Sequence, residues 1–201
     1  MAIIGPRQSG RSNTLAVLID ELRAPGGGEL FVVNPRRSVA LKTRAKSVTR
    51  YAETAEDAEA LWRDLAAGIE ERSRQFASGG LDGLTPLAVI IDDLDTLEIP
   101  FDANASLERA VLRGQDVGVT IFASANSLAL RATYPSGLTK ALLNLRAGLL
   151  LTPQTVDDFD LLAVRGRPSR MGPGRGYWCE GGTRHGVQVA LASKAVPGTA
   201  K

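Results

Sequence analysis

A short run near the start of the sequence combines glycines, a cation and a hydroxyl at spacings that suit phosphate binding. The run is Gly5-Pro6-Arg7-Gln8-Ser9-Gly10-Arg11-Ser12. Glycines allow a tight turn in which backbone N–H groups approach an anion closely. In the pattern G-x-x-x-x-G-K-[ST], the lysine neutralises the β- and γ-phosphates of a nucleotide and the final hydroxyl ligates Mg²⁺. The run therefore predicts a nucleotide site in which Arg11 replaces the lysine.

The elements around this run favour the same interpretation. An apolar strand precedes it at 1–4, and a helix with leucines at helical spacing follows at 13–22. The N-terminus of that helix directs its unpaired N–H groups at the phosphates. We expect the nucleotide to contact seven residues: Gly5, Gln8, Ser9, Gly10, Arg11, Ser12 and Asn13. The alternative is a glycine- and serine-rich turn between a strand and a helix.

Arg11 indicates an altered site, because a guanidinium is a planar fork and not a compact point charge. It binds phosphate well but does not follow a transferring phosphoryl group as lysine does. We therefore expect nucleotide binding to be retained and hydrolysis to be weakened.

A second apolar run, Leu87 to Ile91, ends in acids and predicts a buried parallel strand with carboxylates at its C-terminal edge. We expect Asp92 to hold Mg²⁺ together with Ser12. Asp93 stands where many P-loop ATPases have a glutamate that positions the attacking water. It is one methylene shorter, and a misplacement of about 1 Å costs about 100-fold in rate. Asp95 fits a solvated turn better.

A third strand at 118–126 ends in polar residues. Either Asn126 or Ser124 senses the γ-phosphate, or each caps backbone groups in a loop. Arginine fingers act across subunit contacts, and we favour Arg131 for such a trans-acting role because it follows this strand closely. Further candidates on connecting segments are Arg36, Arg37 and Arg175. Surface salt pairing is the alternative for each arginine.

Composition limits the function classes. The 201 residues suit one α/β domain. A net charge of +2 is no electrostatic footprint of a duplex-binding protein. Cys179 is the sole cysteine, which excludes an internal disulfide and fits a reducing compartment. The sole histidine, His185, falls in a predicted hairpin. No apolar run is long enough to span a bilayer.

Strands and helices alternate along the chain, which predicts a RecA-like core with a mainly parallel sheet flanked by helices and a C-terminal hairpin. Further strands are expected at 29–33, 148–151, 177–180 and 187–191, and further helices at 54–76, 105–113, 138–145 and 156–163. Glycine-rich turns are expected at 26–28 and 78–83, and a polar connector at 34–51. We expect one domain over 1–192 and a disordered tail over 193–201. The early position of the phosphate-binding run suggests a module of a longer polypeptide.

These features together resemble the FtsK/SpoIIIE-type P-loop ATPases, and most of all a C-terminal ATPase module of the EccC-type ATPase of type VII secretion. The resemblance covers nearly the whole chain and rests on the order and spacing of its motifs. The residues that carry it are Gly5–Ser12, Asn34-Pro35-Arg36-Arg37-Ser38, Asp92-Asp93, Asn126 to Tyr134, Gly148-Leu149-Leu150-Leu151, Pro173-Gly174-Arg175-Gly176 and Val187-Gln188-Val189.

The resemblance implies ATP and Mg²⁺ as ligands, neighbouring ATPase modules on the same chain, and a hexamer of the full-length protein. It implies the cytoplasmic, soluble part of an inner-membrane secretion complex, with the membrane reached only through other parts. It also implies regulation of a motor domain and recognition, in an apolar pocket, of the C-terminal signal of exported WXG-type proteins. Leu128, Leu130, Tyr134 and Leu138 either line such a groove or belong to the core.

Two other functions remain open at this stage. The chain is alternatively the motor domain of an FtsK/SpoIIIE-type DNA translocase, although its charge does not favour DNA as a partner. It is otherwise a scaffold with a vestigial nucleotide site. Both alternatives predict different ligands from those of a secretion module.

Overall fold

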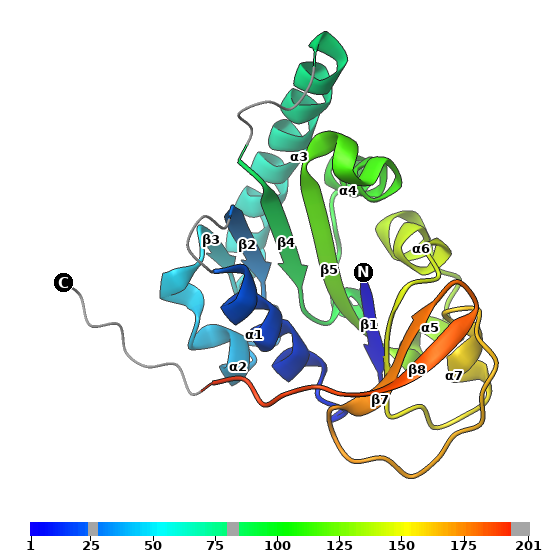
Figure 1. Ribbon diagram of the computed structural model, residues 1–201. Coiled ribbons are helices and arrows are strands. Elements are labelled where there is room, and N and C mark those ends of the chain that lie inside the picture. The colour runs from blue at the N-terminus through cyan, green and yellow to red at the C-terminus, as the bar shows by residue number, and fades with distance from the viewer. Residues whose placement is uncertain (24–27, 80–84, 194–201) are drawn as a thin grey trace.

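The computed structural model describes residues 1–23, 28–79 and 85–193, which form an eight-stranded sheet between two layers of helices (Figure 1). The strand order is β3-β2-β4-β5-β1-β6-β7-β8. The strands are β1 Ala2–Gly5, β2 Glu29–Val33, β3 Arg50–Ala52, β4 Leu87–Ile91, β5 Val119–Asn126, β6 Gly148–Leu151, β7 Arg175–Glu180 and β8 Thr183–Gln188.

The helices surround the sheet on both faces. They are α1 Arg11–Leu22, α2 Val39–Lys42, α3 Ala55–Ser78, α4 Phe101–Arg113, α5 Ser127–Ala132, α6 Gly137–Asn144 and α7 Asp157–Asp160. Single 3₁₀ turns occur at Ala45–Ser47, Leu94–Thr96 and Gly114–Val117. The N-cap of the long α3 is Thr54, whose hydroxyl accepts a hydrogen bond from the Asp57 backbone N–H.

The sheet topology places the functional segments next to one another. The first six strands in the order are parallel, and β5 lies between β1 and β4. The carboxyl ends of β1, β4 and β5 therefore meet at one edge, where Gly5 pairs with Asn126. Apolar strands buried on both faces favour this parallel arrangement. The sheet is completed by the antiparallel hairpin β7–β8, whose turn residues Gly181 and Gly182 both have positive φ.

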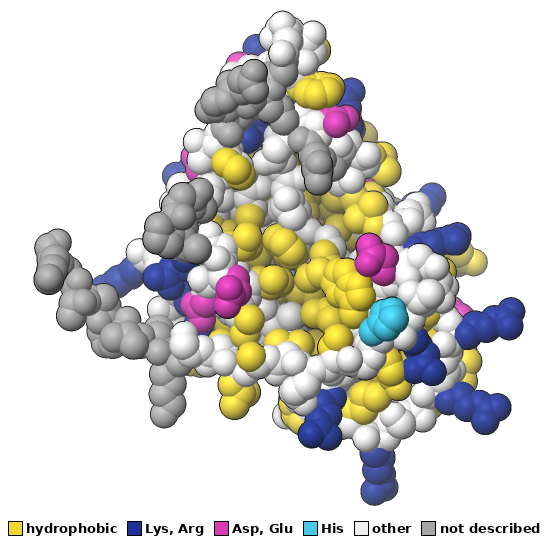
Figure 2. Space-filling model, viewed as in Figure 1, with side chains coloured by type: hydrophobic (Ala, Val, Ile, Leu, Met, Phe, Trp, Pro, Cys, Tyr) yellow, Lys and Arg dark blue, Asp and Glu magenta, His cyan; other side chains and the backbone are white. Residues whose placement is uncertain are grey.

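Two apolar clusters, one on each face, hold the layers together. On one face α3, α4 and α6 pack on the sheet around the fully buried Trp62 and Leu107. On the other face α1 and α2 pack around Leu15, Ile19 and Leu41. Figure 2 shows that apolar side chains also gather over the centre of the molecule, with the histidine at their edge. The helices thus fix the sheet while leaving part of its apolar surface only partly covered.

The expected fold class and hairpin are confirmed. Several local expectations differ from the structure. The connector 34–51 contains α2 and β3, because Tyr51 and Ala52 extend the parallel sheet beside β2. The residues after β5 form the short α5, for which the sequence analysis gives no helix, and the acidic helix expected at 156–163 is reduced to α7. The return strand of the hairpin begins earlier, since β8 pairs with β7 from Thr183.

Some expectations fall outside the described residues. These are most of the glycine turn at 26–28, most of the loop at 78–83, and the tail from 194 to 201. The extent of the domain stays a prediction. Within the described ranges, no helix is both long and apolar enough to cross a membrane.

Candidate nucleotide site

The phosphate-binding run forms a loop between β1 and α1, as its pattern predicts. Gln8 and Gly10 both have positive φ, of 63° and 100°, and Gly10 caps α1. Within the described part of the chain, no side chain caps the N-terminus of α1, and its first turn holds no acid. The Oγ atom of Ser9 is buried in the loop and has no hydrogen-bond partner among the described residues. Helical N–H groups and an unpaired hydroxyl suit an anion.

A late turn of the chain supports this loop from the side. The backbone N–H of Gly174 donates to the carbonyl oxygen of Ser9 over 2.8 Å. The approach is close, because a Cβ atom placed on Gly10 would lie 2.9 Å from the Gly174 nitrogen. The phosphate loop therefore packs against the turn Pro173-Gly174-Arg175-Gly176, which is one of the residue runs that carry the family resemblance.

Arg11 folds back beneath the loop. Its side chain is 9% exposed. One terminal nitrogen donates to the carbonyl oxygen of Gly5 over 2.9 Å, and the other donates to a carboxylate oxygen of Asp93 over 2.6 Å. A lysine has one nitrogen and cannot make both contacts in this fork-like way. The replacement therefore joins the phosphate loop to the acids after β4.

Asp92 is buried and held by two hydroxyl groups. The Oγ atom of Ser12 donates to one of its oxygens over 2.7 Å, and the Oγ atom of Ser124 donates to the other. Mg²⁺ in nucleotide sites takes one or two carboxylates together with phosphate oxygens and waters. Ser12 and Asp92 fit that role, and the described residues contain no cluster of three or more acids, histidines or cysteines that would hold a metal by themselves.

Asp93 lies between two arginines. Its backbone is left-handed, with φ of 48°, and its N–H donates to the Ser124 hydroxyl over 2.9 Å. Its second carboxylate oxygen lies 3.4 Å from the Nε atom of Arg36, whose side chain is 46% exposed. Burial and the nearby charge of Asp92 raise the pKa of Asp93, against the opposing effect of Arg11 and Arg36. The site is therefore crowded with acids that the arginines only partly balance.

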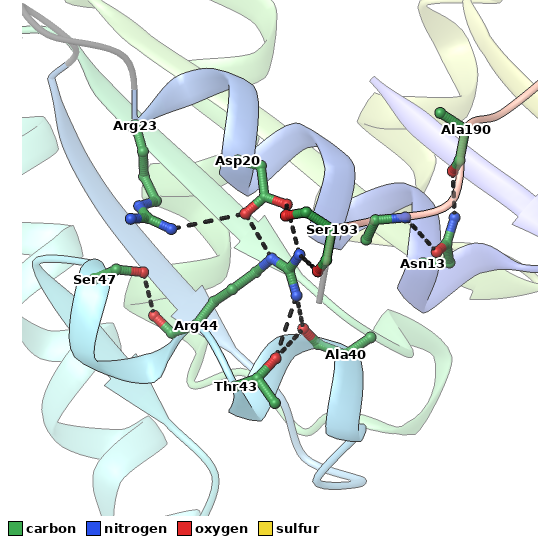
Figure 3. Close-up of polar contacts among 10 residues, drawn as sticks. Asn13, Asp20, Arg23, Ala40, Thr43, Arg44, Ser47, Ala190 and Ser193 are labelled. Atoms are coloured by element: carbon green, nitrogen blue, oxygen red, sulfur yellow. Dashed lines mark hydrogen bonds and ion pairs between the residues drawn. The ribbon is translucent and has the colours of Figure 1, made fainter. Parts of the chain in front are cut away.

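The side chain of Asn13 contacts the chain's late segment (Figure 3). Its amide nitrogen donates to the Ala190 carbonyl oxygen over 2.8 Å, and its amide oxygen accepts from the Ala192 N–H over 2.9 Å. Farther along, the Ser193 hydroxyl donates to Asp20, and the Ser193 carbonyl oxygen accepts from Arg44. Among the residues expected at the nucleotide, Asn13 thus has a structural partner for its side chain. Ser193, expected in the tail, is part of this contact.

The two remaining site candidates, Asn126 and Arg131, each have partners other than Asp92 and Asp93 for their side chains. The side chain of Asn126 caps α5 by accepting from the Leu128 N–H over 3.0 Å, and its own N–H donates to Asp95. Arg131 lies in α5 and points to the segment around α7. It donates to Thr155 and lies 3.3 Å from the fully buried Asp158. Arg131 is therefore paired within its own chain.

Among the arginines considered for a trans-acting role, Arg36 is the one that lies at Asp93, where it joins Arg11. The sequence favours Arg131 among the four candidates for that role, and this choice stays a prediction. A topological signal was present: Arg36 follows directly after β2, and β2 is the parallel neighbour of β4. Residues just beyond the carboxyl ends of adjacent parallel strands lie close together.

The four residues considered for an apolar groove divide evenly. Leu130 and Leu138 are core residues, whereas Leu128 and Tyr134 are exposed. A cavity of about 550 Å³ opens elsewhere, between the carboxyl ends of β2 and β3, the start of α3 and the segment 96–100. Its apolar lining includes Trp62, and Glu53, Glu59 and Glu98 also line it. We call this cavity the α3 groove.

Comparisons with known proteins place this geometry in context. No protein-family model matches the chain. The ESX-5 secretion system protein EccC5 of Mycobacterium marinum (strain ATCC BAA-535 / M) is 26% identical over 222 residues, a match that covers 95% of this chain and 15% of that protein. The chain thus spans a small part of this relative.

Several solved structures share the fold, two of which illustrate the range. Thermomonospora curvata EccC (ATPases 2 and 3), in complex with a signal sequence peptide, has a TM-score of 0.76 at 22% identity, covering 96% of this chain and 37% of that one. The pCW3 conjugation coupling protein TcpA, with ATPγS, has a TM-score of 0.70 at 14% identity, covering 96% of this chain and 60% of that one. The resemblance to EccC-type and FtsK-like ATPase domains is therefore confirmed.

Proposed function

We propose that the chain is an ATP-binding module of a type VII secretion ATPase, which binds ATP with Mg²⁺, hydrolyses it weakly or not at all, and regulates a motor domain of the same polypeptide. The observation that carries the proposal is the buried Arg11–Asp93 ion pair inside an otherwise intact phosphate loop. The similarity to EccC5 over 95% of the chain supports the assignment to secretion.

The ion pair favours binding over turnover for a chemical reason. A carboxylate that positions an attacking water must be free to accept its proton. Both carboxylate oxygens of Asp93 face arginines instead, one at 2.6 Å and one at 3.4 Å. Mg²⁺ held by Ser12 and Asp92 supplies charge neutralisation for the phosphates when it is bound. The loop's N–H groups and Mg²⁺ ligands are thus retained, while the water-positioning acid is engaged elsewhere.

Calorimetric titration of the chain with ATP and Mg²⁺, together with a phosphate-release assay, tests the proposal. We expect saturable binding in the wild type, its loss in Ser12→Ala, and turnover far below about 1 s⁻¹, the lower end of ordinary enzyme rates. Tyr134→Ala serves as a control away from the loop, because the Tyr134 side chain is fully exposed. Turnover at rates of a motor enzyme would refute the regulatory role, and undetectable binding in the wild type would leave a vestigial site.

Signal recognition is the second part of the proposed function. The Thermomonospora curvata EccC structure holds a signal sequence peptide, and the α3 groove of this chain supports a comparable ligand because it combines an apolar floor with room for side chains. We propose that the C-terminal signal of an exported WXG-type protein binds there. The glutamates that line the groove favour a signal with basic residues.

Peptide titration monitored by fluorescence anisotropy tests this assignment. Ala58 lines the groove and is 8% exposed, so Ala58→Phe should reduce peptide affinity by filling it. The matched variant Tyr134→Ala changes an exposed aromatic outside the groove and should leave affinity unchanged. If Tyr134→Ala weakens binding and Ala58→Phe does not, the peptide binds at the exposed residues near α5. If neither substitution changes the affinity, the peptide binds at neither the α3 groove nor these residues.

The resemblance also supports a hexamer of the full-length protein on the cytoplasmic side of an inner membrane, with neighbouring modules as partners. Mass photometry of the full-length protein with and without nucleotide tests the assembly. Particles restricted to the monomer mass in both conditions would contradict it.

A further inference from the structure

Asp93 contacts two arginines, Arg11 from the phosphate loop and Arg36 from the segment after β2. The Arg11 contact is short and buried, at 2.6 Å with side chains only 9% and 10% exposed. Arg36 approaches the other carboxylate oxygen at 3.4 Å from the open side. Charge-assisted hydrogen bonds of this kind are the strong ones in proteins, and breaking a buried pair leaves an uncompensated charge.

A terminal phosphate would compete with Asp93 for these arginines. The cation at the Arg11 position of the loop pattern serves the β- and γ-phosphates. Here that cation already has two acceptors, Gly5 and Asp93. Releasing Asp93 would leave its carboxylate, next to that of Asp92, near the incoming charge.

The inner phosphates face a different environment. The N-terminus of α1, with Gly10 as its cap, and the unpaired hydroxyl of Ser9 stay available whether or not Asp93 keeps its arginines. Binding at these groups needs no rearrangement of the ion pair. The β-phosphate has these donors in addition to the Arg11 guanidinium, so displacing Asp93 matters most for a γ-phosphate.

We propose that Asp93 is a specificity-determining residue that makes the site take a nucleoside diphosphate in preference to the triphosphate. The proposal rests on the proposed function, since it requires a nucleotide in the loop, and it adds which nucleotide the site prefers. Arg11 and Arg36 act together, because the second arginine holds the carboxylate whenever the first one turns to a phosphate.

Titration of the chain with ADP and with ATP, each with Mg²⁺, tests the proposal by the ratio of the two dissociation constants. Asp93→Asn removes the charge, and asparagine tolerates the left-handed backbone at this position. Asp95→Asn is the matched control: it removes the same charge two residues away and keeps an oxygen for the Asn126 N–H. We expect ADP to bind about tenfold more tightly than ATP in the wild type, the factor for one hydrogen bond to a charged group.

Asp93→Asn should abolish this preference, and Asp95→Asn should change it by less than about threefold. Arg36→Gln should weaken ATP binding selectively in the wild type and have no effect in the Asp93→Asn background, because the two residues act as one unit. Loss of ATP affinity from Arg36→Gln in both backgrounds would instead make Arg36 a direct phosphate ligand and overturn the proposal.

The proposed preference for the diphosphate would also be overturned if the wild type bound ATP at least as tightly as ADP, or if Asp93→Asn and Asp95→Asn had equal effects on the ratio of dissociation constants. In either case the proposed function would stand. Binding of neither nucleotide would refute the proposed function and this inference together. Thermal unfolding of each variant, followed by circular dichroism, confirms that the compared chains are folded.

Discussion

The ion pair between Arg44 and Asp20 joins α1, α2 and the late segment that includes Ser193 (Figure 3). The Arg44 side chain is 3% exposed and meets both carboxylate oxygens of Asp20, at 2.7 and 2.5 Å. Asp20→Asn removes the opposing charge and leaves the guanidinium with neutral acceptors, among them the Ala40 carbonyl oxygen. We therefore expect this single substitution to destabilise the protein substantially.

The magnitude follows from burial. Loss of one partner of a fully buried pair costs about 3–5 kcal/mol. The Asp20 side chain is 25% exposed, and asparagine keeps one acceptor, so we expect about 2–3 kcal/mol. For a chain of 150–250 residues, each kcal/mol lowers the melting temperature by about 2–4 °C, which gives a decrease of about 4–12 °C.

Thermal unfolding followed by circular dichroism measures this decrease against a matched control. Glu59→Gln removes the same charge from an exposed pair with Arg63, whose side chains are 69% and 72% exposed, and should lower the melting temperature by less than about 2 °C. Equal decreases for the two variants would refute the reasoning. The double variant Asp20→Asn/Arg44→Met should be more stable than Asp20→Asn alone, because it removes the stranded charge.

The same pair predicts a dependence on pH. Its hydrogen bonds with Arg44 hold the pKa of Asp20 below its ordinary value. The stabilisation is therefore present above the unfolded pKa of aspartate, about 3.9, and is lost as the pH falls through the lower folded value. In Asp20→Asn, this part of the acid-induced loss of stability should disappear.

Three further substitutions or probes test other parts of the structure. Gly10→Ala should abolish nucleotide binding and lower the free energy of unfolding by about 1–3 kcal/mol, because φ at this position is 100° and the new Cβ atom would lie 2.9 Å from the Gly174 nitrogen. Calorimetry measures the binding and denaturant unfolding measures the stability. Gly68→Ala is the control, because a Cβ atom there meets no atom within 4 Å among the described residues. Arg131→Met should cost about 3 kcal/mol by stranding the buried Asp158 and leave nucleotide affinity unchanged, and a parallel loss of affinity would contradict its placement. Burial raises the pKa of the Cys179 thiol to about 11, so a disulfide reagent at pH 8 should modify it only after unfolding; rapid labelling of the folded chain would show that β7 is accessible.

Sequence reasoning reached the fold and the main parts of the site because both depend on local patterns. The apolar runs of β1, β4 and β5 and the glycine spacing of the loop are each readable over a few residues. A parallel sheet then brings the carboxyl ends of such strands together without further information. Ser12 and Asp92 were assigned jointly for this reason, and they are hydrogen-bonded in the structure.

Side-chain partners were less accessible to such reasoning. Arg11 was expected to bind phosphate, yet its contact with Asp93 spans 82 residues and depends on the length of a guanidinium and on the left-handed backbone after β4. Asn13 was expected at the nucleotide, yet its amide matches the backbone at 190–192. Short elements such as α5 were missed because six residues give too little periodicity to separate a helix from a loop.

The contact between Gly174 and Ser9 also bears on how the protein folds. It joins residues 165 positions apart, and β1 itself lies between strands that come much later in the chain. Such distant pairings slow folding, since the entropy of closing long loops is lost before the contacts form. We expect the phosphate loop to become ordered late, after synthesis of the β7–β8 hairpin. A nascent chain that ends before residue 174 would then lack this support for its phosphate loop.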